Sequence, residues 1–92
     1  MLGRRLVLSP VDGSPFQPGA IVKIIEICDD VGHDVGLQDR VGQFGVVKYL
    51  EYSCGCGQHY PDDPMIGVRF KDNMVCEFWK EEIVHAALQT TP

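Results

Sequence analysis

One stretch constrains the fold more than any other. Residues 42–70 contain two β-rich segments, residues 46–52 and residues 65–70, separated by a loop of unusual composition. In the second segment every other residue is apolar: Ile66, Val68 and Phe70. A period of two places such residues on one face of a sheet, which predicts a strand that covers a core. The loop, residues 53–64, holds two cysteines, a histidine, two prolines and two aspartates. A strand, an exposed loop and a second strand form a scaffold that presents the loop to something else.

The rest of the chain predicts further short strands joined by turns. Residues 20–28 are rich in β-branched side chains, and Val22 and Ile24 are expected to face the core. Residues 75–79 and 84–88 are expected to be strands, with a helical or 3₁₀ turn at residues 80–83 between them. This order predicts an all-β fold, a small SH3-like barrel of about five strands with a 3₁₀ turn before the last strand.

The length of 92 residues is that of one domain with a modest core. Residues 1–19 are expected to be an irregular lead-in with a short edge strand at residues 6–8, residues 20–88 the barrel, and residues 89–92 a frayed tail. The chain has no run of eighteen apolar residues, and its first apolar run is too short for a signal peptide. These features predict a cytoplasmic protein that does not cross a membrane.

Charge is distributed unevenly along the chain. Thirteen acidic and eight basic residues give a net charge of -5, which disfavours direct binding to nucleic acid. Residues 24–39 contain five acids and residues 49–68 contain three, and neither stretch contains a Lys or Arg. Acidic runs of this kind are usually ordinary solvated surface, and the alternative is a negative face that attracts a basic partner.

Four pieces of the sequence, in this order and spacing, resemble the CarS family of bacterial antirepressors. They are residues 11–13 with 18–23 (VDG and PGAIVK), 42–47 (GQFGVV), 60–66 (YPDDPMI) and 78–83 (FWKEEI). The third piece is the most specific, whereas residues 54–59 (CGCGQH) depart from the pattern. The resemblance implies an SH3-like barrel whose acidic surface imitates DNA. Such a protein binds the DNA-recognition helix of a MerR-type repressor and keeps it off its operator.

The acidic stretches of the sequence are consistent with a surface that binds a basic recognition helix. A recognition helix is basic because it meets phosphates, and carboxylates can accept the same bidentate bonds from Arg. The acids expected on a partner-binding face are Glu51, Asp62, Asp63, Glu77, Glu81 and Glu82. Prolines follow Tyr60 and Asp63, which favours extended backbone there and would hold the two aspartates stiffly. A simple turn-capping role for Asp62 is compatible with the same sequence.

Cys54, Cys56 and His59 form the only metal-like cluster in the sequence. Zinc would need a fourth ligand, for which the candidates are Cys28, Cys76 and His33. The spacing lacks the second cysteine pair of a closed structural site, so no cofactor is expected, and a zinc-binding accessory domain is the third hypothesis. Cys28 and Cys76 are expected to be reduced and to fill the core as small apolar residues.

Catalysis is not expected. A cysteine nucleophile with His59 as its base would lack an orienting third group, and a small barrel offers little concavity for a substrate. The second functional hypothesis is an SH3-like interaction module with a non-regulatory partner. Such modules bind polyproline in an aromatic groove, for which Trp79 and Tyr60 are the candidates. Trp79 is expected in the core, with an exposed binding role as the alternative.

Overall fold

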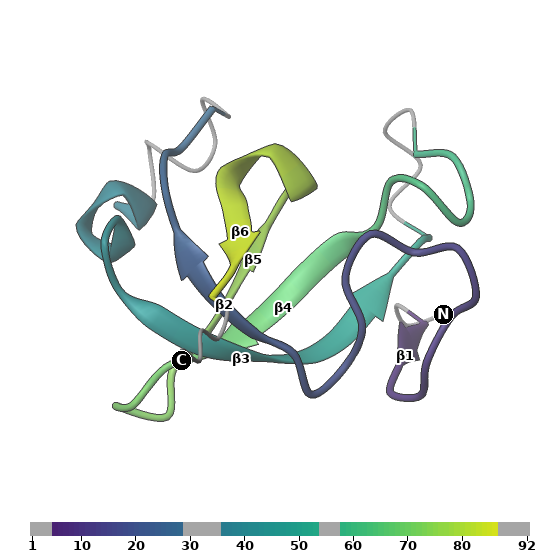
Figure 1. Cartoon of the computed structure of the whole chain (residues 1–92), viewed down its shortest axis with the longest axis horizontal. Coiled ribbons are helices and arrows are strands. Elements are labelled where there is room, and N and C mark those ends of the chain that lie inside the picture. The colour runs from purple at the N-terminus through teal and green to yellow at the C-terminus, as the bar shows by residue number, and fades with distance from the viewer. Residues whose placement is uncertain (1–4, 29–35, 54–57, 87–92) are drawn as a thin grey trace, which may run out of the picture.

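A computed structural model of the chain describes residues 5–28, 36–53 and 58–86 (Figure 1). The elements in chain order are β1 (Leu6–Val7), β2 (Ile21–Ile24), the 3₁₀ turn η1 (Leu37–Arg40), β3 (Phe44–Glu51), β4 (Met65–Arg69), β5 (Val75–Phe78), the 3₁₀ turn η2 (Lys80–Glu82) and β6 (Ile83–His85). The predicted all-β, barrel-like fold is confirmed, including the 3₁₀ turn directly before the last strand.

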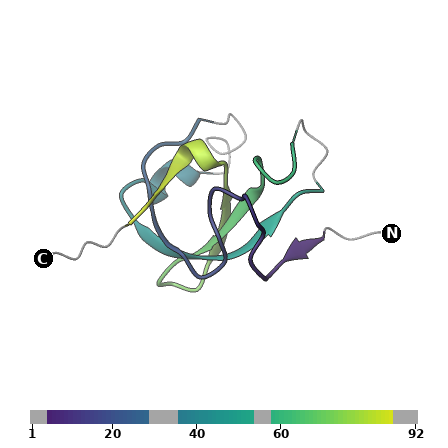
Figure 2. The same ribbon diagram turned by 45° about the vertical axis from the view of Figure 1, so that its right-hand side comes forward.

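The strands form one antiparallel sheet in the order β5-β4-β3-β2-β6, and β1 pairs with β3 outside this path. β3 is the central strand. Its first half pairs with β2, where Ile21 lies opposite Val46, and its end pairs with β1, where Leu6 lies opposite Glu51. The twisted sheet curls around a common interior, which Figure 2 shows best.

The core follows the alternation seen in the sequence. Val22, Ile24, Ile66 and Val68 are all 0% exposed, as predicted from their period of two. The remaining core members are Val11, Phe16, Ile27, Val47, Leu50, Phe70, Phe78 and Ile83. Two of these, Val11 and Phe16, belong to the lead-in, so this segment packs against the barrel although its sequence predicted only an irregular stretch.

The end of β2 differs from the sequence prediction. A strand was expected over residues 20–28, but β2 ends at Ile24, opposite Ile83 at the start of β6. The Ile25 amide still donates to the Glu82 carbonyl at 2.9 Å, but Glu82 belongs to η2 and not to a strand, so the ladder goes no further. Cys28 therefore lies outside any strand and is exposed, so its predicted place in the core is wrong. Cys76 lies in β5, partly buried against the core.

The last strand begins one residue earlier than predicted, at Ile83. Residues 87–88 of the predicted strand and the predicted tail at residues 89–92 lie outside the described residues. No helix among the residues that the structure describes is long and apolar enough to cross a membrane.

Candidate functional site

Three connections lie in the upper part of Figure 1: residues 25–28 after β2, residues 58–64 before β4, and η2 between them. The Lys80 ammonium lies 3.0 Å from an Asp63 carboxylate oxygen, which ties η2 to the segment before β4. The Cys28 amide donates to the Glu82 carboxylate at 2.7 Å, which ties η2 to the segment after β2. We call the surface formed by Glu26, Asp62, Asp63 and Glu81 on these connections the acidic edge.

The segment before β4 is anchored on several sides. The Asp63 amide donates to the His59 carbonyl at 2.8 Å, and the Tyr52 hydroxyl donates to the carbonyl of Pro61 at 2.9 Å. The Tyr60–Pro61 peptide is cis, and Pro64 is fully buried. A side chain at Gly13 would come within 3.0 Å of the Pro61 ring, so the lead-in packs closely against this turn. Asp62 is therefore exposed on a turn whose neighbours are fixed.

Asp63 differs from Asp62 in being neutralised locally. Its carboxylate contacts Lys80 at 3.0 Å and the His59 ring at 3.2 Å, and its side chain is 29% exposed. The hydrogen bond from Lys80, followed by that from His59, lowers the pKa of Asp63 below its ordinary value. Asp63 thus positions the turn, whereas Asp62 and Glu81 expose their carboxylates to solvent.

This ion pair predicts an acid-dependent loss of stability. Because the folded pKa of Asp63 lies below the ordinary 3.8, its stabilisation is complete above that value and disappears as the pH falls through the folded pKa. Asp63→Asn should therefore reduce the difference in the free energy of unfolding between about pH 6 and about pH 3. Lys80→Met should produce a smaller reduction, because the His59 ring still contacts the Asp63 carboxylate, and the double variant should show no more than Asp63→Asn alone. Denaturant titrations at several pH values measure this, and an unchanged acid dependence in both variants would contradict it.

Two of the six carboxylates expected on a binding face are not on the surface. Glu51 is 0% exposed and Glu82 is 2% exposed, so their predicted place on an exposed face is wrong. The Glu51 carboxylate accepts bonds from the amide and hydroxyl of Ser53 at 2.7 and 2.5 Å. The Glu82 carboxylate accepts from the amides of Trp79 and Cys28 at 2.8 and 2.7 Å. Both acids hold loop backbone in place, a role that a count of charges along the sequence does not reveal.

The other predicted site residues are exposed to different degrees. Asp62 and Glu81 are exposed and Asp63 is partly exposed on the acidic edge. Glu77 is half-buried in β5 and accepts a hydrogen bond from the Tyr49 hydroxyl at 2.5 Å. The Tyr49 ring lies over Gly67, where a side chain would collide with it. Glu26 belongs to the acidic edge although it was not among the predicted site residues.

The predicted metal cluster is only partly within the described residues. Cys54 and Cys56 lie outside them, and the His59 ring is 3.2 Å from an Asp63 oxygen. In residues 5–28, 36–53 and 58–86, no group of three or more His, Cys, Asp or Glu side chains could hold a metal ion.

We expect the purified protein to keep its fold without metal, because Cys54, Cys56 and His59 lack the second ligand pair of a closed structural zinc site. Circular dichroism before and after dialysis against a chelator, together with elemental analysis, tests this. One equivalent of zinc per chain, removed by the chelator with loss of the fold, would overturn the expectation.

Aromatic side chains lie beside the acidic edge. The rings of Tyr52 and Tyr60 are 4.7 Å apart between centroids, and Tyr60 is 70% exposed. Burial raises the pKa of the Tyr52 hydroxyl. Trp79 precedes η2 and is half-buried, so it is less enclosed than the predicted core position. The sequence pointed to Tyr60 and Trp79 but gave no sign that Tyr52 packs against Tyr60.

Comparisons with known proteins found no matching family model, no matching curated protein and no matching solved structure.

Proposed function

We propose that this protein is an antirepressor-like binding protein. Its acidic edge binds the DNA-recognition element of a MerR-type transcriptional repressor in place of operator DNA. The observation that carries this proposal is the exposure of Asp62 and Glu81 on two separate connections that the Asp63–Lys80 ion pair links at 3.0 Å. The resemblance of residues 60–66 to the CarS family supports a MerR-type partner over other basic proteins.

The chemistry of recognition follows from charge and spacing. A recognition helix carries Arg and Lys side chains that meet phosphates at regular intervals along DNA. Carboxylates at fixed positions can accept the same charge-assisted bonds, including bidentate bonds from Arg. Glu26 and Glu81 extend the negative surface beyond Asp62 toward the segment after β2. There, desolvation, followed by the hydrogen bond to Glu26 and by the nearby charges of Glu26, Glu82 and Glu81, raises the pKa of the Cys28 thiol.

Rigidity favours this use of the acidic edge. The backbone around Asp62 is held by the Tyr52–Pro61 hydrogen bond and by the packing of Gly13 on the Pro61 ring. η2, which carries Glu81, is held by the buried Glu82. Side chains on fixed backbone lose less freedom on binding, so more of the electrostatic attraction contributes to affinity. Binding is the whole activity in this proposal, with no catalytic step, cofactor or contact to nucleic acid.

A second candidate function has its own supporting observation. The exposed Tyr60 ring, packed on Tyr52 beside the acidic edge, offers an aromatic surface of the kind that binds polyproline segments. In that case the protein would be an SH3-like interaction module with a non-regulatory partner. Trp79→Ala and Tyr60→Ala would then abolish binding, and salt would have little effect.

Affinity capture from the source cells distinguishes these candidates. We expect the immobilised wild-type protein to retain a helix-turn-helix protein of the MerR type. An Asp62→Lys bait should lose it, whereas an Asp39→Lys bait, with the same charge change on the exposed side of η1, should keep it. Equal capture by both variants would contradict a role for the acidic edge. Recovery of only enzyme subunits or proline-rich proteins would favour the second candidate.

A further inference from the structure

A second surface lies on the outer face of the sheet, near the turn between β4 and β5. The strand register places Ile21, Val46, Arg69 and Val75 in one row across four strands. Ile21 is 57% exposed and Val75 is 42% exposed. The turn between β4 and β5 lies at the opposite end of the molecule from η2 and the acidic edge (Figures 1 and 2). This surface is therefore separate from the one that the proposed function uses.

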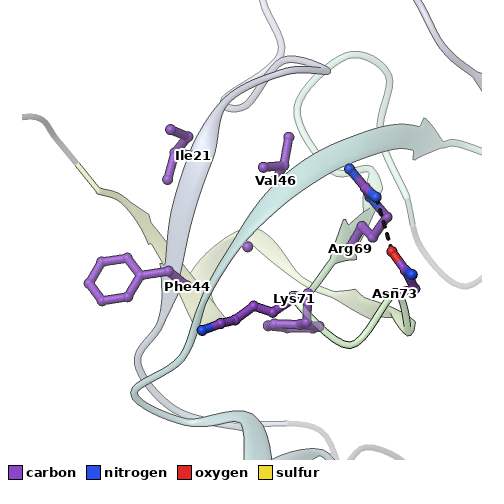
Figure 3. Close-up of a pocket in the computed structure, with 8 residues that line it drawn as sticks. Ile21, Phe44, Val46, Arg69, Lys71 and Asn73 are labelled. Carbon is purple, nitrogen blue, oxygen red and sulfur yellow. Dashed lines mark hydrogen bonds between the residues drawn. The ribbon is translucent and has the colours of Figure 1, made fainter.

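A shallow groove of about 290 Å³ lies within this surface. Its labelled lining residues in Figure 3 are Ile21, Phe44, Val46, Arg69, Lys71 and Asn73. The Phe44 ring is 56% exposed and points outward, and the Lys71 side chain extends toward it (Figure 3). Gly45 also lines the groove, and a side chain there would collide with Val68 and with the Arg69 carbonyl. We call this feature, mostly apolar and open to solvent, the Phe44 groove.

Positive charge surrounds the Phe44 groove, although the chain as a whole is acidic. Arg69 and Lys71 line it, and the Lys23 ammonium lies 5.6 Å from the centre of the Phe44 ring. None of the lining residues is acidic. Within the described parts of the chain, no ion pair engages Lys23, Arg69 or Lys71. The Arg69 guanidinium donates to the Asn73 side chain at 3.2 Å, a neutral partner that leaves its charge uncompensated.

We propose that the Phe44 groove binds an acidic protein segment that carries an apolar side chain. The apolar side chain would lie against Phe44 and Ile21, and flanking carboxylates would pair with Lys71, Arg69 and Lys23. Exposed apolar patches with a polar rim mark protein interaction sites, and charge complementarity selects an acidic partner here.

Two other occupants fit less well. A second copy packed face to face would bring Lys23, Arg69 and Lys71 against the same three cations, which is repulsive. Single-stranded nucleic acid stacks on several aromatic rings, whereas the groove presents Phe44 with aliphatic neighbours. The net charge of -5 also opposes a polyanion more strongly than a short acidic peptide.

A titration of the ¹⁵N-labelled protein, followed by amide chemical shifts, tests the proposal. The probe is a capped peptide with a central Leu-Phe pair flanked by Asp and Glu. Matched probes replace the acids by Lys or the Leu-Phe pair by Gly-Ser, and a short oligothymidylate represents nucleic acid. We expect the acidic Leu-Phe peptide to shift the amides of residues 21–23, 44–46 and 69–73, and the matched probes to bind at least about tenfold more weakly.

Matched variants locate the binding to the groove. Phe44→Ser and Lys71→Glu should each weaken peptide binding about tenfold, because they remove the apolar contact and reverse a charge. Lys48 is an exposed residue of β3 outside the groove, and Lys48→Glu makes the same charge change there. This variant should change affinity by less than about twofold. Stronger binding of oligothymidylate or of the Lys peptide would overturn the proposal. So would shifts that depend on protein concentration without peptide, or no shifts at the groove.

Discussion

Glu82→Ala is expected to lower the free energy of unfolding by about 2–4 kcal/mol, a large fraction of the stability of a small domain. The Glu82 carboxylate accepts hydrogen bonds from the amides of Trp79 and Cys28. The main-chain carbonyl of Glu82 accepts a hydrogen bond from the Ile25 amide at 2.9 Å. Removing the side chain leaves both amides without their charged acceptor and opens a cavity under η2. Denaturant unfolding followed by circular dichroism and by the fluorescence of Trp79, the single tryptophan, measures the loss.

Glu81→Ala is the matched control, because Glu81 is the exposed neighbour in the same turn. It should change stability by no more than about 0.5 kcal/mol. Glu82→Gln should lie between the two, since the amide keeps the shape but has one acceptor oxygen instead of two. If Glu82→Ala is as stable as Glu81→Ala, the buried carboxylate does not hold η2.

The fold is predictable because core-facing apolar residues occur at every second position where the strands are. A period of two identifies Ile66 and Val68 in one strand and Val22 and Ile24 in another as core-facing, and each is 0% exposed. The end of β2 is not predictable in this way, because the β-branched residues continue to Ile27. The strand ends where its partner strand begins: Ile24 lies opposite Ile83, and the next partner, Glu82, belongs to η2, far away in the chain. A local pattern carries no information about such a distant partner.

The acidic site is predictable only in part, for a similar reason. Charge counting finds Asp62 and Glu81, but it treats every carboxylate as exposed. Glu51 and Glu82 are buried because each accepts nearby main-chain amides at the end of a strand or turn. The pairing of Asp63 with Lys80 also depends on the fold, since it joins two connections. A Glu three residues after Trp79, the residue that precedes η2, is the one available signal, because that spacing is typical of a helix-capping carboxylate.

Reversing Asp62 and Glu81 together to Lys should weaken binding to the proposed repressor partner by more than about a hundredfold, because cations would then face cations. Asp63 is left unchanged in this variant, since reversing it would also break the ion pair with Lys80. The folded state should survive, because both substituted side chains are exposed and contribute within about 0.5 kcal/mol. Asp62→Lys alone is compared with Asp39→Lys alone, which changes the net charge equally and should bind as the wild type does.

Salt should weaken the same complex steeply. Exposed charges are screened over about 8 Å at physiological ionic strength, so attraction between the acidic edge and a basic helix falls as salt is added. The double reversal should remove most of this salt dependence together with the affinity. Equal affinity of the wild type and the double reversal at each salt concentration would show that Asp62 and Glu81 are not at the interface. Loss of binding only on Trp79→Ala would place the partner on the aromatic surface instead.

The most direct measurement is a competition for the repressor between this protein and labelled operator DNA, followed by fluorescence anisotropy. The repressor is the helix-turn-helix protein recovered by affinity capture. We expect the wild-type protein and Asp39→Lys to release the DNA completely as they saturate the repressor, and Asp62→Lys with Glu81→Lys to leave the DNA bound. A ternary complex, in which the repressor holds this protein and the DNA together at saturation, would contradict the central claim that the acidic edge occupies the DNA-binding surface.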